Sequence, residues 1–244
     1  MKYINQALEI SGIEPKASIL EGFDKYSEMI LNYSKKFNLT AFKDQKQITE
    51  ELIIRSLRIT KNFGGNVNPG NWFNEKKLID IGTGAGIPGI PLKIIFPELS
   101  ITLLDSNKKK CYFLEEVIKD LDLKKIDVIN ARAEDLAHDH KHREKYDIVT
   151  ARALAPLTTL SELCVPFISI GGTGIFPKGD NVQKEINDSK KFIEFLGCAP
   201  PLYKIVESPG FSPKDIILYI MKIEKTSNKF PRKSGIPSKR PYKL

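Results

Sequence analysis

The chain has 244 residues, of which 41% are hydrophobic and 28% are charged. A chain of this length and composition can bury one α/β core, which excludes a wholly disordered protein and two large domains. Its 38 Lys and Arg against 30 Asp and Glu give a formal net charge of +8, a balance that favours a polyanionic partner without identifying one. The three cysteines are widely spaced and form no CxxC pair, so neither a disulfide framework nor a zinc site is expected.

The amino-terminal residues lack the apolar core of a signal peptide, and no apolar run is long enough to span a bilayer. We therefore expect a cytoplasmic protein that has no membrane partner. We further expect it to be a monomer.

A helical extension is expected at the amino-terminal side. Apolar residues recur at helical spacing over residues 20–37. A second helical pattern follows Asp44, which together with Gln47 resembles a capping box. Turn-forming residues then dominate the segment 64–71, as is typical of a linker. We therefore assign residues 1–70 to a helical extension and its linker.

Short β-rich runs alternate with helical patterns from residue 71 to 224, which is typical of a parallel sheet with crossover helices. The last two β-rich runs are separated by Ser208-Pro209-Gly210 and a few further residues, a gap too short for a crossover helix. They predict an antiparallel hairpin, which the α/β, Rossmann-like seven-stranded S-adenosylmethionine-dependent methyltransferase fold has and a dinucleotide-binding dehydrogenase normally lacks. The expected strands are 77–81, 100–104, 125–130, 146–151, 172–176, 202–207 and 215–223, and the expected helices lie near 88–96, 107–121, 158–167 and 181–195.

Residues 225–244 carry many cations among Pro, Ser and Gly. This composition predicts a basic, extended carboxyl-terminal tail. Counted from the end of the last strand, the cations are Lys222, Lys225, Lys229, Arg232, Lys233, Lys239, Arg240 and Lys243.

The first expected strand runs directly into Gly82-Thr83-Gly84-Ala85-Gly86-Ile87-Pro88-Gly89. Glycines are needed where a backbone adopts positive φ or approaches a ligand closely, although glycine-rich turns without a ligand also occur. Gly84, Gly86 and Gly89 satisfy the GxGxxG fingerprint as well, so the loop alone does not separate a nicotinamide cofactor from S-adenosylmethionine. Asp105, at the end of the next strand, suits the ribose hydroxyls of either cofactor.

Two further acidic positions favour a methyl donor. Asp80 precedes the first glycine of the loop, where a carboxylate suits the ammonium group of a methionine moiety and sits poorly beside a pyrophosphate. Its alternative role is hydrogen bonding within the loop. Ala133-Glu134-Asp135 follows the third strand, where methyltransferases hold the adenine amino group, and the alternative there is an acidic turn that caps a helix.

Arg152 and Lys178 follow the fourth and fifth strands, at the sheet edge where α/β proteins bind ligands. Two cations there suit a carboxylate or a phosphate, with surface ion pairs as the alternative for each. His138, His140 and His142 alternate with charged residues in a polar segment, which we interpret as a solvated loop, so no metal site is expected. No Ser-His-Asp or Cys-His arrangement is indicated.

Together these residues resemble the small-subunit ribosomal RNA guanine-N7 methyltransferase family, RsmG (formerly GidB), over most of the chain. The run Ile87-Pro88-Gly89-Ile90-Pro91 after the glycines is the most specific part of the resemblance. The family usually places a histidine and an aspartate in the second amino-terminal helix, where this chain has Leu52 and Arg55. The other matching motifs are Phe37-Asn38-Leu39-Thr40, Asp80 to Gly86, Leu103-Leu104-Asp105-Ser106, Ala151-Arg152-Ala153, Pro177-Lys178-Gly179 and Phe230-Pro231-Arg232-Lys233.

The resemblance implies S-adenosylmethionine as the cofactor, with contacts at Gly82, Ile87, Asp105, Ala133, Glu134 and Arg152. It also implies a guanine in the decoding region of 16S rRNA, in the small ribosomal subunit, as the substrate. Guanine N7 carries a lone pair and loses no proton on methylation, so no general base is expected and positioning is most of catalysis. Arg152 and Lys178 are the expected orienting residues, while the tail and the helical lobe hold the RNA. The full expected cofactor set is Asp80, Gly82, Gly84, Gly86, Ile87, Asp105, Ser106, Ala133, Glu134 and Arg152.

Three other functions remain open at this point. A small-molecule S-adenosylmethionine methyltransferase is opposed by the basic tail. An NAD-dependent oxidoreductase is opposed by the hairpin and by the short chain left for a substrate domain. A noncatalytic RNA-binding protein is opposed by the intact glycine loop and its carboxylates.

Overall fold

The computed structural model describes residues 2–60, 69–208 and 211–243. The described residues form a seven-stranded sheet with the strand order β3-β2-β1-β4-β5-β7-β6. The first five strands are parallel, and β7 lies antiparallel between β5 and β6. This topology confirms the expected Rossmann-like fold with its closing hairpin. The strands are β1 (Lys77–Ile81), β2 (Ser100–Asp105), β3 (Ile126–Asn130), β4 (Tyr146–Thr150), β5 (Ile168–Lys178), β6 (Leu202–Ser208) and β7 (Phe211–Met221).

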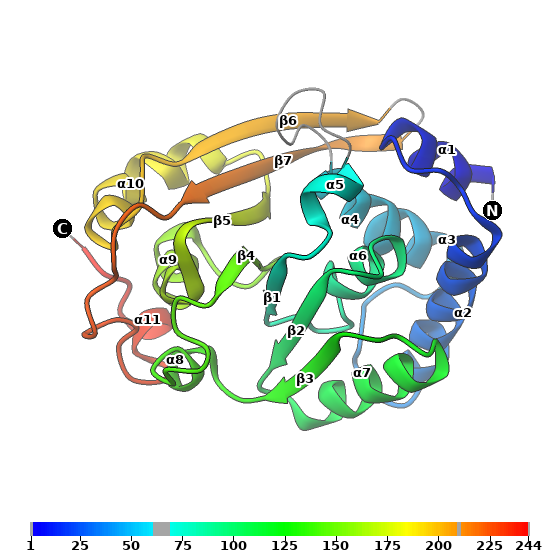
Figure 1. Cartoon of the computed structure of the whole chain (residues 1–244), viewed down its shortest axis with the longest axis horizontal. Helices are drawn as coiled ribbons and strands as arrows, with labels where there is room; N and C mark the ends of the chain where they lie inside the picture. Colours follow the sequence, from blue (N-terminus) through cyan, green and yellow to red (C-terminus); the bar gives the residue numbers. More distant parts are fainter. Residues whose placement is uncertain (1, 61–68, 209–210, 244) are drawn as a thin grey trace.

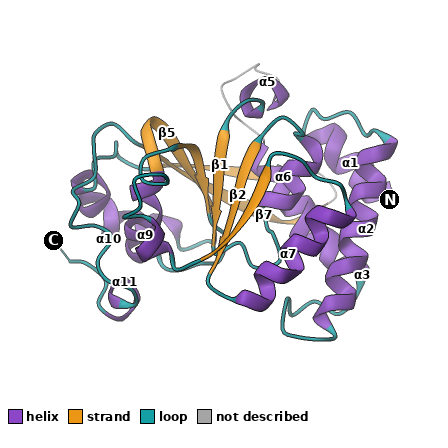
Figure 2. Ribbon diagram, turned by 60° about the horizontal axis from the view of Figure 1, so that its bottom comes forward, coloured by secondary structure: helices purple, strands orange, loops and turns teal. Residues whose placement is uncertain are grey.

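Helices cover both faces of the sheet, and Figure 2 shows them as two layers, with α1, α2, α3, α6 and α7 on one side and α9, α10 and α11 on the other. No helix in the described part of the chain is both long and apolar enough to cross a membrane. The helices are α1 (Lys2–Ile10), α2 (Ala17–Ser34), α3 (Gln45–Gln47), η1 (Ile48–Ile54), α4 (Arg55–Leu57), η2 (Arg58–Thr60), α5 (Pro69–Phe73), α6 (Gly89–Ile95), α7 (Lys108–Asp120), α8 (Ala133–Leu136), α9 (Leu157–Cys164), η3 (Val165–Phe167), α10 (Val182–Phe195) and α11 (Ile236–Lys239).

The second expected helix is a continuous series of helical turns, α3, η1, α4 and η2, in which η1 has the wider π-helical pattern. Asp44 Oδ1 accepts a hydrogen bond from the backbone N–H of Gln47 at 2.9 Å. Gln47 Oε1 accepts from the N–H of Lys43 at 3.4 Å, so its side chain does not return to Asp44. The expected capping box is therefore half formed.

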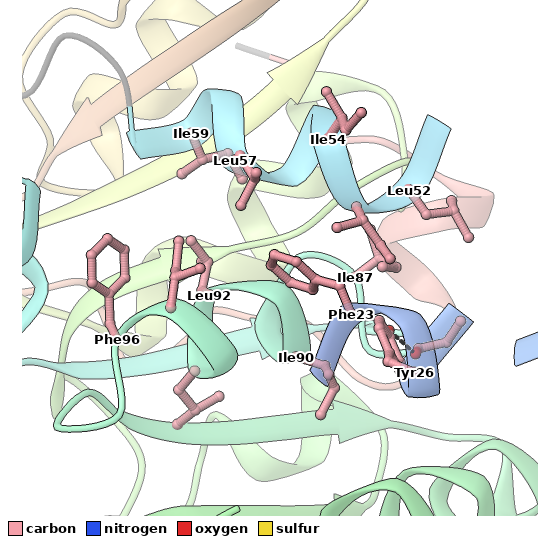
Figure 3. Close-up of a cluster of buried hydrophobic side chains, with 14 of the residues drawn as sticks. Phe23, Tyr26, Leu52, Ile54, Leu57, Ile59, Ile87, Ile90, Leu92 and Phe96 are labelled. Carbon is pink, nitrogen blue, oxygen red and sulfur yellow. Dashed lines mark hydrogen bonds between the residues drawn. The ribbon is translucent and has the colours of Figure 1, made fainter. Parts of the chain in front are cut away.

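The helical extension shares one hydrophobic core with the sheet and α6 (Figure 3). Phe23 and Tyr26 of α2 and Leu57 of α4 pack in the same buried cluster as Ile90 and Leu92 of α6. Burying side chains of this size stabilises a fold by about 1.5–3 kcal/mol each. Because these residues complete each other's burial, the described helices of the extension pack as a layer against α6 and the sheet.

The boundary expected at residue 70 falls within α5, so the division of the chain into domains stays a prediction. Of the expected linker, residues 64–68 lie outside the described residues, and Pro69–Asn71 belong to α5.

β5 is longer than the expected strand over residues 172–176, because it begins at Ile168. Gly171 and Gly172 interrupt the apolar pattern, and Gly171 has a φ of +82°. The pairing between β4 and β5 shifts register at this point. The glycine pair therefore marks an irregularity inside the strand and not its start.

Residues 226–242, called here the C-terminal segment, fold back onto the second layer of helices. Phe230 is buried and its ring centroid lies 5.5 Å from that of Phe192 in α10. The ring of Tyr242 stacks on Phe192 at 4.7 Å. The expectation of an extended tail is therefore wrong, because two aromatic anchors outweigh the polar composition around them.

Two of the cations assigned to the tail hold the fold together. Lys222 is fully buried, and its Nζ lies 3.3 Å from Glu144 Oε1. Arg232 Nη2 lies 2.6 Å from Oε2 of the fully buried Glu162. The remaining cations of the region are exposed, and they are Lys225, Lys229, Lys233, Lys239, Arg240 and Lys243.

A buried ion cluster joins the extension to β7. Asp215 is 2% exposed. Its Oδ1 accepts from Arg55 Nε at 2.9 Å, and its Oδ2 accepts from Arg58 Nη1 at 2.6 Å. Arg55 also binds Glu51 at 2.8 Å. Arg55, one of the two departures from the family pattern, is therefore a structural residue in this chain.

Asp215→Asn should lower the free energy of unfolding by about 3–5 kcal/mol, because Arg55 and Arg58 lose the buried negative charge that both bind. Urea unfolding of the wild type and the variant measures the difference. Glu98→Gln is the matched control, since the ion pair of Glu98 and Lys125 leaves the two side chains 57% and 54% exposed and should contribute little. Equal stability of Asp215→Asn and the wild type would contradict the importance of the cluster.

Candidate functional site

A cavity of about 350 Å³ opens at the carboxyl ends of β1, β2, β3 and β4. Ligands of open α/β sheets bind at this edge. The cavity walls come from the strand ends, from α7, α8 and α9, and from α11 of the C-terminal segment. The lining residues are Ile81, Gly82, Leu104, Asp105, Ser106, Lys110, Ala131, Arg132, Ala133, Glu134, Ala153, Leu154, Leu163 and Ser238.

The cavity brings together half of the expected cofactor set, namely Gly82, Asp105, Ser106, Ala133 and Glu134. The other half of the expected set lies close in sequence to these lining residues but does not line the cavity itself. That half comprises Asp80, Gly84, Gly86, Ile87 and Arg152, and the cofactor role of each stays a prediction.

The glycine loop takes conformations that favour glycine. Gly84 and Gly86 have φ values of +62° and +93°. A Cβ at Gly86 would lie 2.5 Å from Cγ1 of Ile90 and 2.9 Å from Cδ2 of Leu114, whereas at Gly84 no atom would be closer than 3.9 Å. Gly86 is therefore needed for packing, while Gly84 leaves open space at the loop surface.

Asp80 lies under the loop and is fully buried. Its Oδ2 accepts hydrogen bonds from Thr83 Oγ1 at 2.6 Å and from the backbone N–H of Gly89 at 2.9 Å. Burial raises the pKa of Asp80 to about 7, although both hydrogen bonds favour the carboxylate. Its Oδ1 is buried and receives no hydrogen bond from the described residues. The structure thus gives Asp80 a role in fixing the loop, and its contact with a methionine ammonium stays a prediction.

Asp105 joins the loop to the cavity. Its Oδ2 accepts from the N–H of Gly84 at 2.9 Å, and its Oδ1 accepts from the N–H of Asn107 at 2.8 Å. Each carboxylate oxygen has a second lone pair. A carboxylate fixed in this way, at the end of β2 and on the cavity wall, suits the two hydroxyls of a ribose.

Glu134 lies on the opposite wall, in the short helix α8, and is 3% exposed. Its Oε1 accepts from the N–H of Gly235 at 2.8 Å and from Arg132 Nη2 at 3.3 Å. Gly235 and Ser238 belong to the C-terminal segment, which the sequence analysis assigned to RNA alone. The sequence offers no local pattern for this contact, because the two partners lie 101 residues apart.

Arg152 points toward the helical extension. Its Nη2 donates to the backbone oxygen of Glu51 at 2.7 Å, and its buried Nη1 finds no partner among the described residues. Burial and the neighbouring Arg55 lower the pKa of Arg152. It stands at the end of β4, next to Ala153 of the cavity wall.

Lys178 is held away from the cavity. Its Nζ lies 2.6 Å from Glu185 Oε2, and its side chain is 9% exposed. The same oxygen accepts from the N–H of Leu157 at 2.7 Å. The structure therefore gives Lys178 the ion pair that was the alternative to a substrate contact, and its orienting role stays a prediction.

Tyr26 of α2 is a site residue that the sequence analysis missed. It is fully buried, and its hydroxyl donates to the backbone oxygen of Ala85 in the glycine loop at 2.6 Å. The helical spacing of Tyr26 with Phe23 identifies it as a core residue, but nothing in that spacing predicts a contact with the loop.

The described residues contain no cluster of three or more His, Cys, Asp and Glu side chains suited to a metal ion. His138 Nε2 lies 2.8 Å from the backbone oxygen of Pro231, and His142 Nδ1 lies 2.7 Å from the hydroxyl of Tyr146. Two of the three histidines therefore have structural hydrogen bonds.

A glycine turn after β1, a carboxylate at the end of β2, a second carboxylate after β3 and several apolar side chains line one cavity at the carboxyl edge of a Rossmann-like methyltransferase fold. Precorrin-6y C5,15-methyltransferase from Geobacter metallireducens has a similar structure, with a TM-score of 0.50 at 15% identity over 80% of this chain and 98% of that chain.

The family model GidB, described as rRNA small subunit methyltransferase G, matches residues 19–209. Ribosomal RNA small subunit methyltransferase G of Acetivibrio thermocellus is 42% identical, over 91% of this chain and 88% of that protein. The protein of the same name from Clostridium tetani is 40% identical over 100% of both chains. The chain therefore belongs to the rRNA small subunit methyltransferase G family.

Asp80→Asn should change how stability depends on pH. A pKa raised to about 7 in the fold means that the protonated carboxyl stabilises the fold fully below about pH 4, and that this stabilisation is lost as the pH rises through 7. The asparagine does not titrate. The free energy of unfolding of the wild type minus that of the variant should therefore fall between pH 4 and 7, by at most about 1.4 kcal/mol per pH unit. A pH-independent difference in urea unfolding would contradict the raised pKa.

Gly84→Ala and Gly86→Ala should separate conformational cost from packing cost. Both place an alanine at positive φ, which costs about 1–2 kcal/mol, but only Gly86→Ala also meets Ile90 and Leu114. We expect Gly86→Ala to lose clearly more stability than Gly84→Ala in thermal or urea unfolding. Equal losses would show that the contacts behind Gly86 are not tight.

Proposed function

We propose that the protein transfers the methyl group of S-adenosylmethionine to N7 of a guanine in the decoding region of 16S rRNA. The observation that carries the proposal is membership of the rRNA small subunit methyltransferase G family along the length of the chain. The cavity at the carboxyl edge of the sheet supports it, because its residues suit an adenosine group. We further propose that the protein acts as a monomer, in the cytoplasm where ribosomal subunits are found.

The residues present fit S-adenosylmethionine. Asp105 would hold the ribose hydroxyls and Glu134 the adenine amino group, while Gly82 would let the backbone approach the ligand beside Ser106. The buried Oδ1 of Asp80, which has no partner among the described residues, fits a nearby ammonium. When bound, S-adenosylmethionine supplies an electrophilic methyl group attached to a sulfonium.

The chain's own residues position the reactants. Guanine N7 needs no base, because its lone pair is free at neutral pH, so the protein's task is alignment. Arg152, whose side chain is fixed by Glu51 and which precedes Ala153 of the cavity wall, orients the guanine or its phosphate. Lys178 can assist only if RNA displaces Glu185 from its ammonium group.

The exposed cations of the C-terminal segment and its flanks bind the RNA backbone beside the cavity. Lys222 and Arg232 are excluded from this set because both are engaged in buried ion pairs. The two enzymatic alternatives, a small-molecule methyltransferase and an NAD-dependent oxidoreductase, are disfavoured by the family match.

The decisive assay incubates the protein with labelled S-adenosylmethionine and either naked 16S rRNA or 30S subunits that lack the modification, followed by mapping of the product. We expect 7-methylguanosine in the decoding region. Absence of 7-methylguanosine from both substrates would refute the assignment, and calorimetric binding of NAD but not of S-adenosylhomocysteine would favour the oxidoreductase.

Gly84→Asp tests in the same assay whether the glycine loop binds the cofactor. The loop surface has room for the new side chain, so the fold should survive, but a second carboxylate beside Asp105 should abolish binding of S-adenosylhomocysteine and methylation. Unchanged affinity would mean that the loop is structural.

A further inference from the structure

The C-terminal segment is anchored firmly at two points away from the cavity. Glu162 of α9 is fully buried and accepts three hydrogen bonds from Arg232, from the backbone N–H at 2.9 Å, Nε at 2.8 Å and Nη2 at 2.6 Å. Charge-assisted bonds of this kind are about twice as strong as neutral ones. The segment is therefore fixed to α9 just before it reaches the cavity.

Arg143 holds the first part of the segment. It donates to the backbone oxygens of Thr226 at 2.9 Å, Ser227 at 3.1 Å and Phe230 at 2.9 Å. One guanidinium thus satisfies three backbone oxygens within five residues of a chain that has no regular secondary structure of its own there.

At the cavity the segment contacts the wall that carries Glu134. The N–H of Gly235 donates to Glu134 Oε1 at 2.8 Å, and Ser234 Oγ donates to Asp135 Oδ1 at 2.9 Å. Thr159 Oγ1 of α9 donates to the oxygen of Pro237 at 3.0 Å. Figure 1 shows the resulting position of α11, beside α8 and α9. Ser238, in the same short helix, lines the cavity.

We propose that the C-terminal segment is part of the cofactor site, with Ser238 in contact with the adenosine end of the ligand and the Gly235–Glu134 hydrogen bond setting the position of the Glu134 carboxylate. The inference rests on the proposed function and names two contacts beyond it. Glu134 lines the cavity, and its Oε1 is bound by Gly235 at 2.8 Å and by Arg132 at 3.3 Å. Displacement of the segment would therefore remove the shorter of the two hydrogen bonds that position the carboxylate expected to bind the adenine amino group.

The arrangement also couples the ligand to the segment. A ligand that binds only the docked form stabilises docking by mass action. The exposed Lys239 and Arg240 follow Ser238 directly, so the same element that completes the cofactor site presents cations to RNA. Adenosine binding and RNA binding are therefore expected to strengthen each other.

The test is calorimetry with S-adenosylhomocysteine on the full chain. Ser238→Ala should weaken binding up to roughly tenfold, the effect of one lost hydrogen bond, and Ser238→Phe should weaken it further by filling the cavity. Ser227→Ala is the control, because it makes the same chemical change in the same segment away from the cavity, and its affinity should equal that of the wild type. Circular dichroism verifies that each variant is folded.

Hydrogen exchange gives a readout that does not depend on any substitution. Saturating S-adenosylhomocysteine should slow exchange of the Gly235 amide in the wild type, because the ligand stabilises the docked segment. Unchanged affinity of both Ser238 variants together with unchanged exchange at Gly235 would overturn the inference while leaving the proposed function intact. A wild type that does not bind S-adenosylhomocysteine at all would instead overturn the proposed function, and this inference with it.

Discussion

The buried carboxylate of Asp80 organises the glycine loop, and the rest of the site depends on that loop. Its Oδ2 joins Thr83, near the start of the loop, to Gly89, where α6 begins. The loop in turn places the N–H of Gly84 on Asp105. The fully buried Asp80, near the end of β1, therefore fixes the loop that in turn binds the Asp105 carboxylate at the cavity wall. Burying that charge is costly, which explains why the two hydrogen bonds do not prevent its pKa from rising.

The loop and the cavity are also supported by segments far away in the sequence. Tyr26 of the helical extension holds Ala85 from behind the loop, and the backbone of Glu51 holds Arg152. From the other side, the C-terminal segment holds Glu134 through Gly235. The helical extension and the C-terminal segment, which precede and follow the sheet in the sequence, thus both contribute contacts to the site. The shared core in Figure 3 gives the extension the rigidity that such positioning needs.

Much of the sheet was predictable because its signals are local. Alternating apolar runs, a glycine turn after β1 and a short final connection were sufficient for the strands and the hairpin. The helix α1 was missed although Ile4, Ala7 and Leu8 have helical spacing and are buried. Two contacts at the site could not be predicted in this way. Glu134 and Arg152 follow strands, but Gly235 and Glu51, which bind them, each lie 101 residues away along the chain. Asp80 differs, because its partners Thr83 and Gly89 are only three and nine residues away, and hydrogen bonding within the loop is the alternative that its place before the first glycine suggests.

Docking of the C-terminal segment makes the cavity a composite of distant parts of the chain. Ser238 of α11 and Leu163 of α9 line the same cavity, and α11 is tied to α9 by the hydrogen bond from Thr159 to Pro237. A substitution that loosens the segment from α9 therefore changes the shape of the cavity even though the strand ends and the glycine loop keep their own contacts.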